Sequence, residues 1–411
     1  MVPKKGRKVM GFRERQKTAI EVTTRPPLKR SGPILAMRGR QLIAVISVVF
    51  VGTQAGNVQV CRDLKSCAAC ADSYIHVLGF KEQCRWCVET QSCGGPLSCP
   101  FGKPVVQRDL FRCPTTHSEA QGKRYSDALG RSLFAVSVSV RDPKPSECLR
   151  NVRPDITYTK TYEVECDGAG NKCKGLLGVS DEAKALYVAY KGTSFDKQLF
   201  AEFLHGLAAQ LGAWEKFESE EAGVITYFHN AFYKLFVESG MKDDLVDLQK
   251  KYPSYRVWVT GHSLGGSLAS MTALYLVKTG SVDRKKMRLV TFGEPRTGNV
   301  AYAKEIESFI DFRYRVIKKN DAVTNLPASA DPNTPLLTAS MYNRQPLYYR
   351  FLVHYDNLMQ PGDSFKICEL SDDHGCRNLA MAGDFSDHTS YFGINQDDYV
   401  REGCPRAQLI R

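Results

Sequence analysis

The stretch Gly261-His-Ser-Leu-Gly-Gly266 restricts the fold more than any other part of this 411-residue chain. It follows a short β-branched run, Arg256-Val-Trp-Val-Thr260, and a helix-like segment comes directly after it. A strand that turns sharply into a helix at Gly-x-Ser-x-Gly lifts the serine hydroxyl above the end of a sheet. The flanking glycines have no Cβ atom, so strand and helix can pass closely. The pattern predicts a strand–turn–helix element with Ser263 as candidate nucleophile.

The chain around this element alternates between two kinds of segment. Strand-like runs occur at 186–190, 256–260, 288–292 and 313–317, and helix-like segments occur at 195–211, 228–251, 264–279 and 299–310. Such alternation favours a mostly parallel sheet with helices on both faces. We therefore expect an α/β fold over residues 125–411.

A cysteine-rich segment precedes this region. Residues 61–113 hold eight of the fourteen cysteines. Two Cys-x2-Cys pairs, at 67–70 and 84–87, lie close to a zinc-ribbon spacing. Four further cysteines crowd the same segment, which favours disulfides over zinc. Cys84-Arg-Trp-Cys87 and the eight-cysteine count resemble the PSI module of plexins, semaphorins and integrins, which implies a spacer or a site for a protein partner.

The first 55 residues are typical of a leader with a secretory signal. A short basic stretch at Met37-Arg-Gly-Arg40, an apolar run from Leu42 to Val51 and small residues at Thr53-Gln-Ala55 follow the order of such signals. Met37 is the expected functional start, and an uncleaved anchor is the alternative. No other segment is apolar over a membrane-spanning length, so we expect no transmembrane helix and a secreted, extracellular protein.

The positive charge of the chain is concentrated in the same leader. Residues 1–40 carry twelve Lys and Arg against two Glu, a net +10, and the whole chain is +12, so the remainder is 12 − 10 = +2. A basic patch on the folded part is therefore not expected, and we predict no nucleic-acid partner.

A serine nucleophile needs a histidine base that a carboxylate orients. Asp321 ends a strand-like run and is the preferred acid, with Asp311 and Asp331 as rivals. His354, His374 and His388 all follow it, and the pattern of residues alone does not choose among these histidines.

From about residue 125 onward the chain resembles the class 3 lipases, the fungal-type triacylglycerol lipases with an α/β-hydrolase fold. Five motifs match in order: Ala189-Tyr-Lys-Gly-Thr193, Phe228-His-Asn-Ala-Phe232, Gly261-His-Ser-Leu-Gly-Gly266, Phe292-Gly-Glu-Pro-Arg-Thr-Gly298 and Asp387-His-Thr-Ser-Tyr-Phe392. Lys191 and Ala231 depart from the usual Arg and Gly of these motifs.

The resemblance implies a nucleophile, an acid and a base, namely Ser263, Asp321 and His388. It also implies that Thr193 and Leu264 form the oxyanion hole. The expected activity is hydrolysis of lipid esters at an interface through an acyl-enzyme, with no cofactor or metal. A phospholipase or acyltransferase with the same triad is one alternative, and a non-catalytic binding protein is another.

Two further expectations concern the catalytic region. Small loops would be closed by Cys166–Cys173 and Cys368–Cys376, which leaves Cys148–Cys404 to join the start of the region to its end.

The helix-like segment 195–211 has one broad apolar face and begins beside Thr193. It is predicted to be either a lid over Ser263 or an ordinary core helix.

Overall fold

The computed structural model describes residues 57–100, 105–107, 110–114, 124–166, 170–192, 214–329, 344–372 and 383–406. The leader, Thr193, the segment 195–211, Asp331, His374 and Cys376 lie outside these residues. Among the described residues, no helix is long and apolar enough to cross a membrane.

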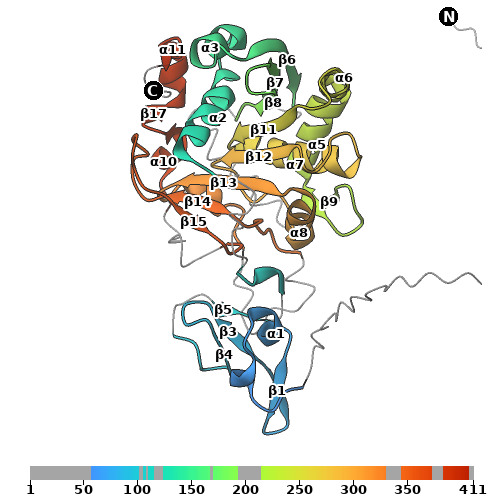
Figure 1. The fold of residues 1–411 in the computed structure, drawn as a ribbon, viewed down its shortest axis with the longest axis vertical. Helices are drawn as coiled ribbons and strands as arrows, with labels where there is room; N and C mark the ends of the chain where they lie inside the picture. The colour runs from blue at the N-terminus through green and yellow to red at the C-terminus, as the bar shows by residue number, and fades with distance from the viewer. Residues whose placement is uncertain are drawn as a thin grey trace, which may run out of the picture. The chain divides into compact units, whose positions relative to one another are not determined.

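An eight-stranded sheet organises residues 124–406 (Figure 1). Its strand order is β15-β14-β13-β12-β11-β8-β7-β6, and the run from β8 through β11, β12 and β13 to β14 is parallel. Antiparallel pairing is confined to the two sides, where β6 and β7 extend the sheet beyond β8 and β15 extends it beyond β14. The strands are β6 (Thr157–Glu165), β7 (Lys172–Ser180), β8 (Ala185–Tyr190), β11 (Arg256–His262), β12 (Met287–Phe292), β13 (Phe312–Lys318), β14 (Leu352–Tyr355) and β15 (Lys366–Cys368). The four strand-like runs and the mostly parallel α/β sheet are confirmed.

Helices cover both faces of this sheet, and successive residues of a strand belong to different hydrophobic clusters. Val188 packs with the cluster that holds α5 (Thr226–Phe232), α6 (Met241–Lys251), α7 (Leu264–Lys278) and α8 (Val300–Phe309). Its neighbour Ala189 packs with the cluster that holds α2 (Asp127–Ser139), α3 (Pro145–Val152) and α11 (Gln396–Arg401). Side chains of a strand point alternately to its two faces, so both faces of β8 are buried.

The helix expected at 228–251 is not continuous. α5 passes into a π-helical segment, Tyr233–Glu238, and α6 begins only at Met241. Gly240 separates them with φ of 85°, a left-handed conformation that no α-helix continues. The apolar spacing correctly predicts helical segments here, but the expected single helix over 228–251 is wrong, because Gly240 interrupts it.

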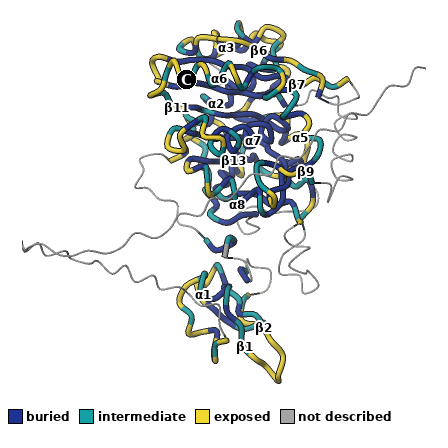
Figure 2. The backbone as a smooth tube through the Cα atoms, turned by 90° about the vertical axis from the view of Figure 1, so that its right-hand side faces the viewer, coloured by how far each residue is buried: buried dark blue, intermediate teal, exposed yellow. Residues whose placement is uncertain are grey.

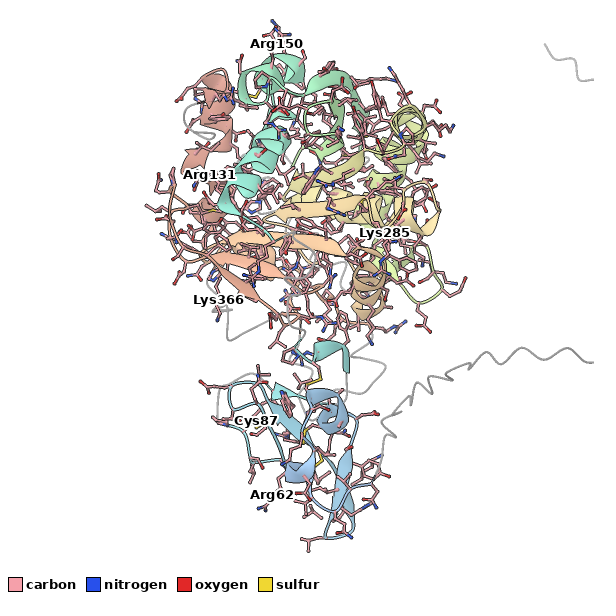
Figure 3. The ribbon with its side chains drawn as sticks, in the orientation of Figure 1. Arg62, Cys87, Arg131, Arg150, Lys285 and Lys366 are labelled. Carbon is pink, nitrogen blue, oxygen red and sulfur yellow. A yellow bond between two sulfur atoms is a disulfide. The ribbon has the colours of Figure 1, made fainter. Side chains whose placement is uncertain are left out.

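Hydrogen bonds and disulfides hold segments together within each face of the sheet. Arg131 of α2 (Figure 3) donates to the carbonyl oxygen of Met359 at 2.5 Å, which fixes this helix to the loop after β14. Cys148–Cys404 joins the beginning and the end of the region across 256 residues, and Cys166–Cys173 closes a small loop, both as expected. Cys368 is disulfide-bonded, while its expected partner Cys376 lies outside the described residues.

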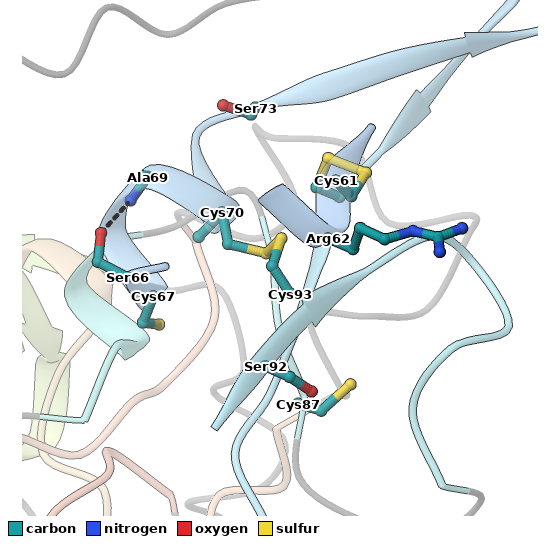
Figure 4. The surroundings of a disulfide bond; sticks show 12 residues. Cys61, Arg62, Ser66, Cys67, Ala69, Cys70, Ser73, Cys87, Ser92 and Cys93 are labelled. Atoms are coloured by element: carbon teal, nitrogen blue, oxygen red, sulfur yellow. Dashed lines mark hydrogen bonds between the residues drawn. A yellow bond between two sulfur atoms is a disulfide. The ribbon is translucent and has the colours of Figure 1, made fainter. Parts of the chain in front are cut away.

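The cysteine-rich segment has little apolar core and is held by four disulfides. They join Cys61–Cys84, Cys67–Cys113, Cys70–Cys93 and Cys87–Cys99, so neither Cys-x2-Cys pair has thiolates free to bind zinc. Cys70–Cys93 links α1 (Cys67–Ala71) to β4 (Ser92–Gly94) (Figure 4). Trp86 of β3 (Arg85–Cys87) is buried in the small hydrophobic cluster that most of these cysteines form.

Candidate functional site

Ser263 occupies the turn between β11 and α7. Its φ of 58° lies in the left-handed region, which is strained for a residue with a side chain. The turn is also tight: a Cβ on Gly261 would lie 2.1 Å from the carbonyl oxygen of Gly265, and one on Gly265 would lie 2.5 Å from that of Tyr190. These distances explain why both flanking positions are glycines.

The environment of Ser263 suits a nucleophile. Its backbone amide donates to the Phe292 carbonyl at 2.9 Å, which fixes the turn against β12. The side chain is buried, yet its hydroxyl forms no hydrogen bond within the described part of the chain. Leu264 begins α7, whose N-terminus carries the positive end of the helix dipole. A negative charge that develops beside Ser263 would be stabilised by that dipole.

Asp321 and His388 meet by their side chains although they lie 67 residues apart. His388 Nδ1 lies 3.0 Å and 2.9 Å from the two carboxylate oxygens of Asp321. Asp321 follows β13 and is fully buried, and His388 lies in the short helix α10 (Phe385–Thr389). The Asp321 carboxylate also accepts hydrogen bonds from the Val323 amide at 3.0 Å and the Tyr391 hydroxyl at 2.7 Å. These contacts hold the imidazole with its Nδ1 side toward the acid.

The serine turn lies against the same histidine. The His262 ring lies 4.5 Å from the His388 ring between centroids, and His262 Nε2 lies 2.9 Å from the His388 carbonyl oxygen. A Cβ on Gly293 would lie 2.9 Å from an Asp321 carboxylate oxygen and 3.0 Å from His388 Nδ1. β11 and β13 are parallel members of one sheet, so their carboxyl ends share an edge, and Ser263 and Asp321 follow their strands at that edge.

Two of the rival candidates, Asp311 and His354, have other partners. Asp311 forms a partly exposed ion pair with Arg284, and His354 of β14 hydrogen-bonds through Nε2 to the carbonyl of Lys319 at 3.1 Å. Asp331 and His374 lie outside the described residues, as does Thr193. The chain just before Thr193 does reach the serine, since a Cβ on Gly192 would lie 3.2 Å from Ser263 Cβ. Burial lowers the pKa of the neighbouring Lys191.

His262 is more than a packing residue in this arrangement. Gln396 Nε2 lies 3.1 Å from His262 Nε2, which also contacts the His388 backbone. Complete burial lowers the pKa of His262 well below its usual value, and the proximity of His388 lowers it further. A neutral His262 therefore packs against His388 and helps to place it.

Two charged side chains of the Phe292–Gly298 motif were not assigned a role from sequence. Glu294 is buried, and its carboxylate accepts hydrogen bonds from four hydroxyl groups: Ser270, Thr291, Thr297 and Tyr349. Burial raises the pKa of Glu294, and the hydrogen bonds from Thr291, Tyr349 and Ser270 oppose that effect. Since Ser270 lies on α7 and Thr291 on β12, Glu294 joins the serine helix to the neighbouring strand.

Arg296 holds the loop that follows Asp321. Its guanidinium donates to the carbonyl oxygens of Asn325 at 2.7 Å and Pro327 at 2.9 Å, and it pairs with the buried Asp372 at 2.8 Å. The Arg296 amide donates to the Leu326 carbonyl, next to a cis Leu326–Pro327 bond. Position within a matched motif was the only sequence signal for Glu294 and Arg296.

Comparison with known proteins agrees with this geometry. The family model described as lipase (class 3) matches residues 187–330. A lipase of Caenorhabditis elegans is 30% identical over 317 residues, which is 70% of this chain and 85% of that protein. A secreted mono- and diacylglycerol lipase of Fusarium solani is 35% identical over 226 residues, 54% of this chain and 60% of that protein.

A solved structure gives the same result for the fold. The crystal structure of a lipase from Rhizopus microsporus var. chinensis aligns with a TM-score of 0.52 at 25% identity, over 68% of this chain and 90% of that one. The expected α/β-hydrolase fold is thereby confirmed.

Proposed function

Because this chain belongs to the class 3 lipase family and is an ester hydrolase, we propose that Ser263, Asp321 and His388 cleave carboxylic esters of lipids through an acyl-enzyme. The observation that carries this proposal is the pair of contacts between the Asp321 carboxylate and His388 Nδ1, beside the strained turn of Ser263. A serine hydroxyl gains nucleophilicity when a base oriented in this way accepts its proton.

The proposed reaction has two stages. The Ser263 oxygen attacks the ester carbonyl carbon while His388 Nε2 accepts the hydroxyl proton, and the C–O bond to the alcohol then breaks as His388 returns that proton to the leaving oxygen. Water next attacks the acyl-enzyme with His388 again as base, which releases the fatty acid and restores Ser263. Asp321 stays ionised and stabilises the imidazolium.

The oxyanion of each tetrahedral intermediate needs donors in place before it forms. We assign this role to the backbone amide of Leu264, at the positive end of α7, and to Thr193. The support for Leu264 is its position directly after the nucleophile, and that for Thr193 is the approach of Gly192 to Ser263.

We further infer that the substrate is met at a lipid interface and that the chain is exported. The leader 1–55 and the disulfides of the described residues support export, because such bonds persist in oxidising compartments. Residues 61–113 are proposed to be a separate PSI-like module ahead of a catalytic domain at 125–411. We propose this module as a spacer or as the site of a protein partner, and its eight cysteines are all disulfide-bonded.

Covalent labelling by a fluorophosphonate probe tests the function directly. The purified chain should be labelled and should hydrolyse a short soluble ester, whereas Ser263→Ala and His388→Ala should lose about 10⁴-fold or more of the turnover. His354→Gln is the matched control, since His354 contacts Lys319 rather than Asp321. Full activity in Ser263→Ala would refute the proposal.

A further inference from the structure

Exposed apolar side chains gather in one hairpin of the cysteine-rich module. β1 (Tyr74–Val77) and β2 (Phe80–Gln83) are joined by a turn at Leu78-Gly79. Leu78 is 93% exposed, Phe80 73% and Val77 43%, so three of the eight large exposed hydrophobic residues in the described parts of the chain lie within four positions. The turn between β1 and β2 projects from the module as an exposed loop (Figure 2).

Folding does not account for a leucine at this position. Leu78 and Gly79 have φ of 51° and 84°, the pattern of a two-residue hairpin turn that favours Asn or Gly at its first central position. A leucine there is strained and buries almost no surface. A large apolar group at the tip therefore costs stability without contributing to a core, which points to a binding role.

The hairpin changes from apolar to cationic along its length. Val77 pairs with Phe80 next to the tip, and His76 pairs with Lys81 on the following rung. Successive residues of a strand are about 3.4 Å apart, so the cationic rung lies roughly 7–10 Å behind the tip. Interfacial elements bury their apolar face about 5–10 Å deep, at the boundary of headgroups and acyl chains.

The cationic rung is built from rings and an ammonium group. Lys81 is exposed, and its Nζ lies 3.8 Å above the Tyr74 ring, which the His76 ring also meets edge-on. Glu82, the acid of the hairpin, lies one rung further from the tip and is half-buried. An inserted tip would thus place Lys81 at the depth of lipid phosphates, with the acid behind it.

The base of the hairpin is held firmly. Gln83 donates to the carbonyl oxygens of Ala71 and Ser73 at 2.9 Å and 2.8 Å, and the next residue, Cys84, is bonded to Cys61. A preorganised element loses little conformational entropy on binding, so the energy of insertion is not offset by ordering.

We propose that the β1–β2 hairpin is a lipid-surface anchor, which inserts Leu78 and Phe80 into an anionic phospholipid surface while Lys81 contacts its phosphates. This inference rests on the proposed lipid ester hydrolysis, because an anchor keeps the catalytic region at the phase that holds its substrate. It assigns the cysteine-rich module a lipid partner rather than a protein partner.

Vesicle flotation of the full chain tests the anchor. The protein carries Ser263→Ala, so that it cannot consume the lipid, and the vesicles contain equal amounts of phosphatidylcholine and phosphatidylglycerol. Leu78→Asn with Phe80→Ser should lower the partition coefficient roughly 100-fold, about tenfold for each lost apolar side chain. Asn suits the turn, so this variant should fold at least as well as the parent.

Two further variants separate the outcomes. Lys81→Glu should weaken binding to the anionic vesicles and leave weak binding to pure phosphatidylcholine unchanged. Leu97→Ser, which changes an equally exposed leucine outside the hairpin, should bind as the parent does. Equal binding of the hairpin variant and the parent, or an equal loss in Leu97→Ser, would overturn the proposal. The proposal would also be overturned if the parent did not bind vesicles made of lipid alone. The exposed hairpin would then be a docking surface for a protein.

Failure of the anchor and failure of the proposed activity are distinguishable. Hydrolysis of a short soluble ester by the chain with Ser263 intact reports the activity alone, and the hairpin variant should retain it. Absence of that hydrolysis in the chain with Ser263 and the hairpin both unchanged would refute the esterase. Vesicle binding, measured with Ser263→Ala, would still report on the hairpin.

Discussion

Replacing Arg296 by Met removes the contacts that hold the loop after Asp321. The Arg296 and Asp372 side chains are only 4% and 6% exposed, and the pair is supported by two further bonds from the guanidinium to backbone carbonyls. Loss of the guanidinium leaves the Asp372 carboxylate buried without its counter-charge, which costs about 3–5 kcal/mol. Each carbonyl that loses its donor adds about 1 kcal/mol.

The predicted total, roughly 5–7 kcal/mol, is a large part of the stability of an ordinary domain. Urea denaturation followed by tryptophan fluorescence, under non-reducing conditions, measures it. Arg284→Met is the control, because Arg284 also pairs with an aspartate but its side chain is 48% exposed and that of Asp311 33%. An exposed pair of this kind contributes less than about 1 kcal/mol.

The double variant Arg296→Met with Asp372→Leu should recover part of the loss, since no buried charge then lacks a partner. Even while folded, Arg296→Met should hydrolyse a soluble ester more slowly, because the loop that it holds begins at Asp321. A free-energy change no larger than that of Arg284→Met would refute the reasoning.

Three other changes have expected outcomes. Replacing Cys148 and Cys404 by Ser opens a 256-residue loop and should lower the unfolding free energy by up to about 5 kcal/mol, and a loss below about 1 kcal/mol in denaturant titration would contradict this. Gly265→Ala places a Cβ 2.5 Å from the Tyr190 carbonyl oxygen, so it should destabilise the fold by about 3 kcal/mol and lower turnover; wild-type turnover would disprove the tight turn. Burial lowers the pKa of His262, so the folded state favours the neutral ring. The contribution of this ring to stability is therefore complete above the ordinary histidine pKa of 6.5 and is lost as pH falls below it. His262→Phe should therefore reduce the decline of the unfolding free energy below that pH by up to about 1.4 kcal/mol per pH unit. Equal slopes of stability against pH for the variant and the unchanged protein, measured by thermal unfolding, would count against this.

Local sequence signals were sufficient where neighbouring residues decide the structure. The β-branched run before Gly261 became β11, and the glycines around Ser263 occupy a turn that leaves no space for a Cβ. Such patterns act over a few residues, because backbone sterics and side-chain period are properties of the chain itself. The cysteine pair that closes a small loop, Cys166–Cys173, was predictable for the same reason.

Contacts between distant residues were decided by packing. Eight cysteines in residues 61–113 allow 105 different sets of four disulfides, and only the folded module selects one of these sets. The residues alone left three histidines open, and it is the meeting of β13 and α10 that brings His388 to Asp321. Nothing in the sequence paired Arg296 with Asp372, 76 residues away.

The interruption at Gly240 was not predicted from the apolar spacing of the sequence. The apolar spacing of 228–251 suits a helix throughout, but Gly240 adopts φ of 85° and separates the π-helical segment from α6. The sequence by itself determined the individual strands of the parallel sheet and the turn that carries Ser263. The tertiary structure decided which of them touch, because hydrogen bonds and buried ion pairs form between surfaces that meet only when the whole sheet has assembled.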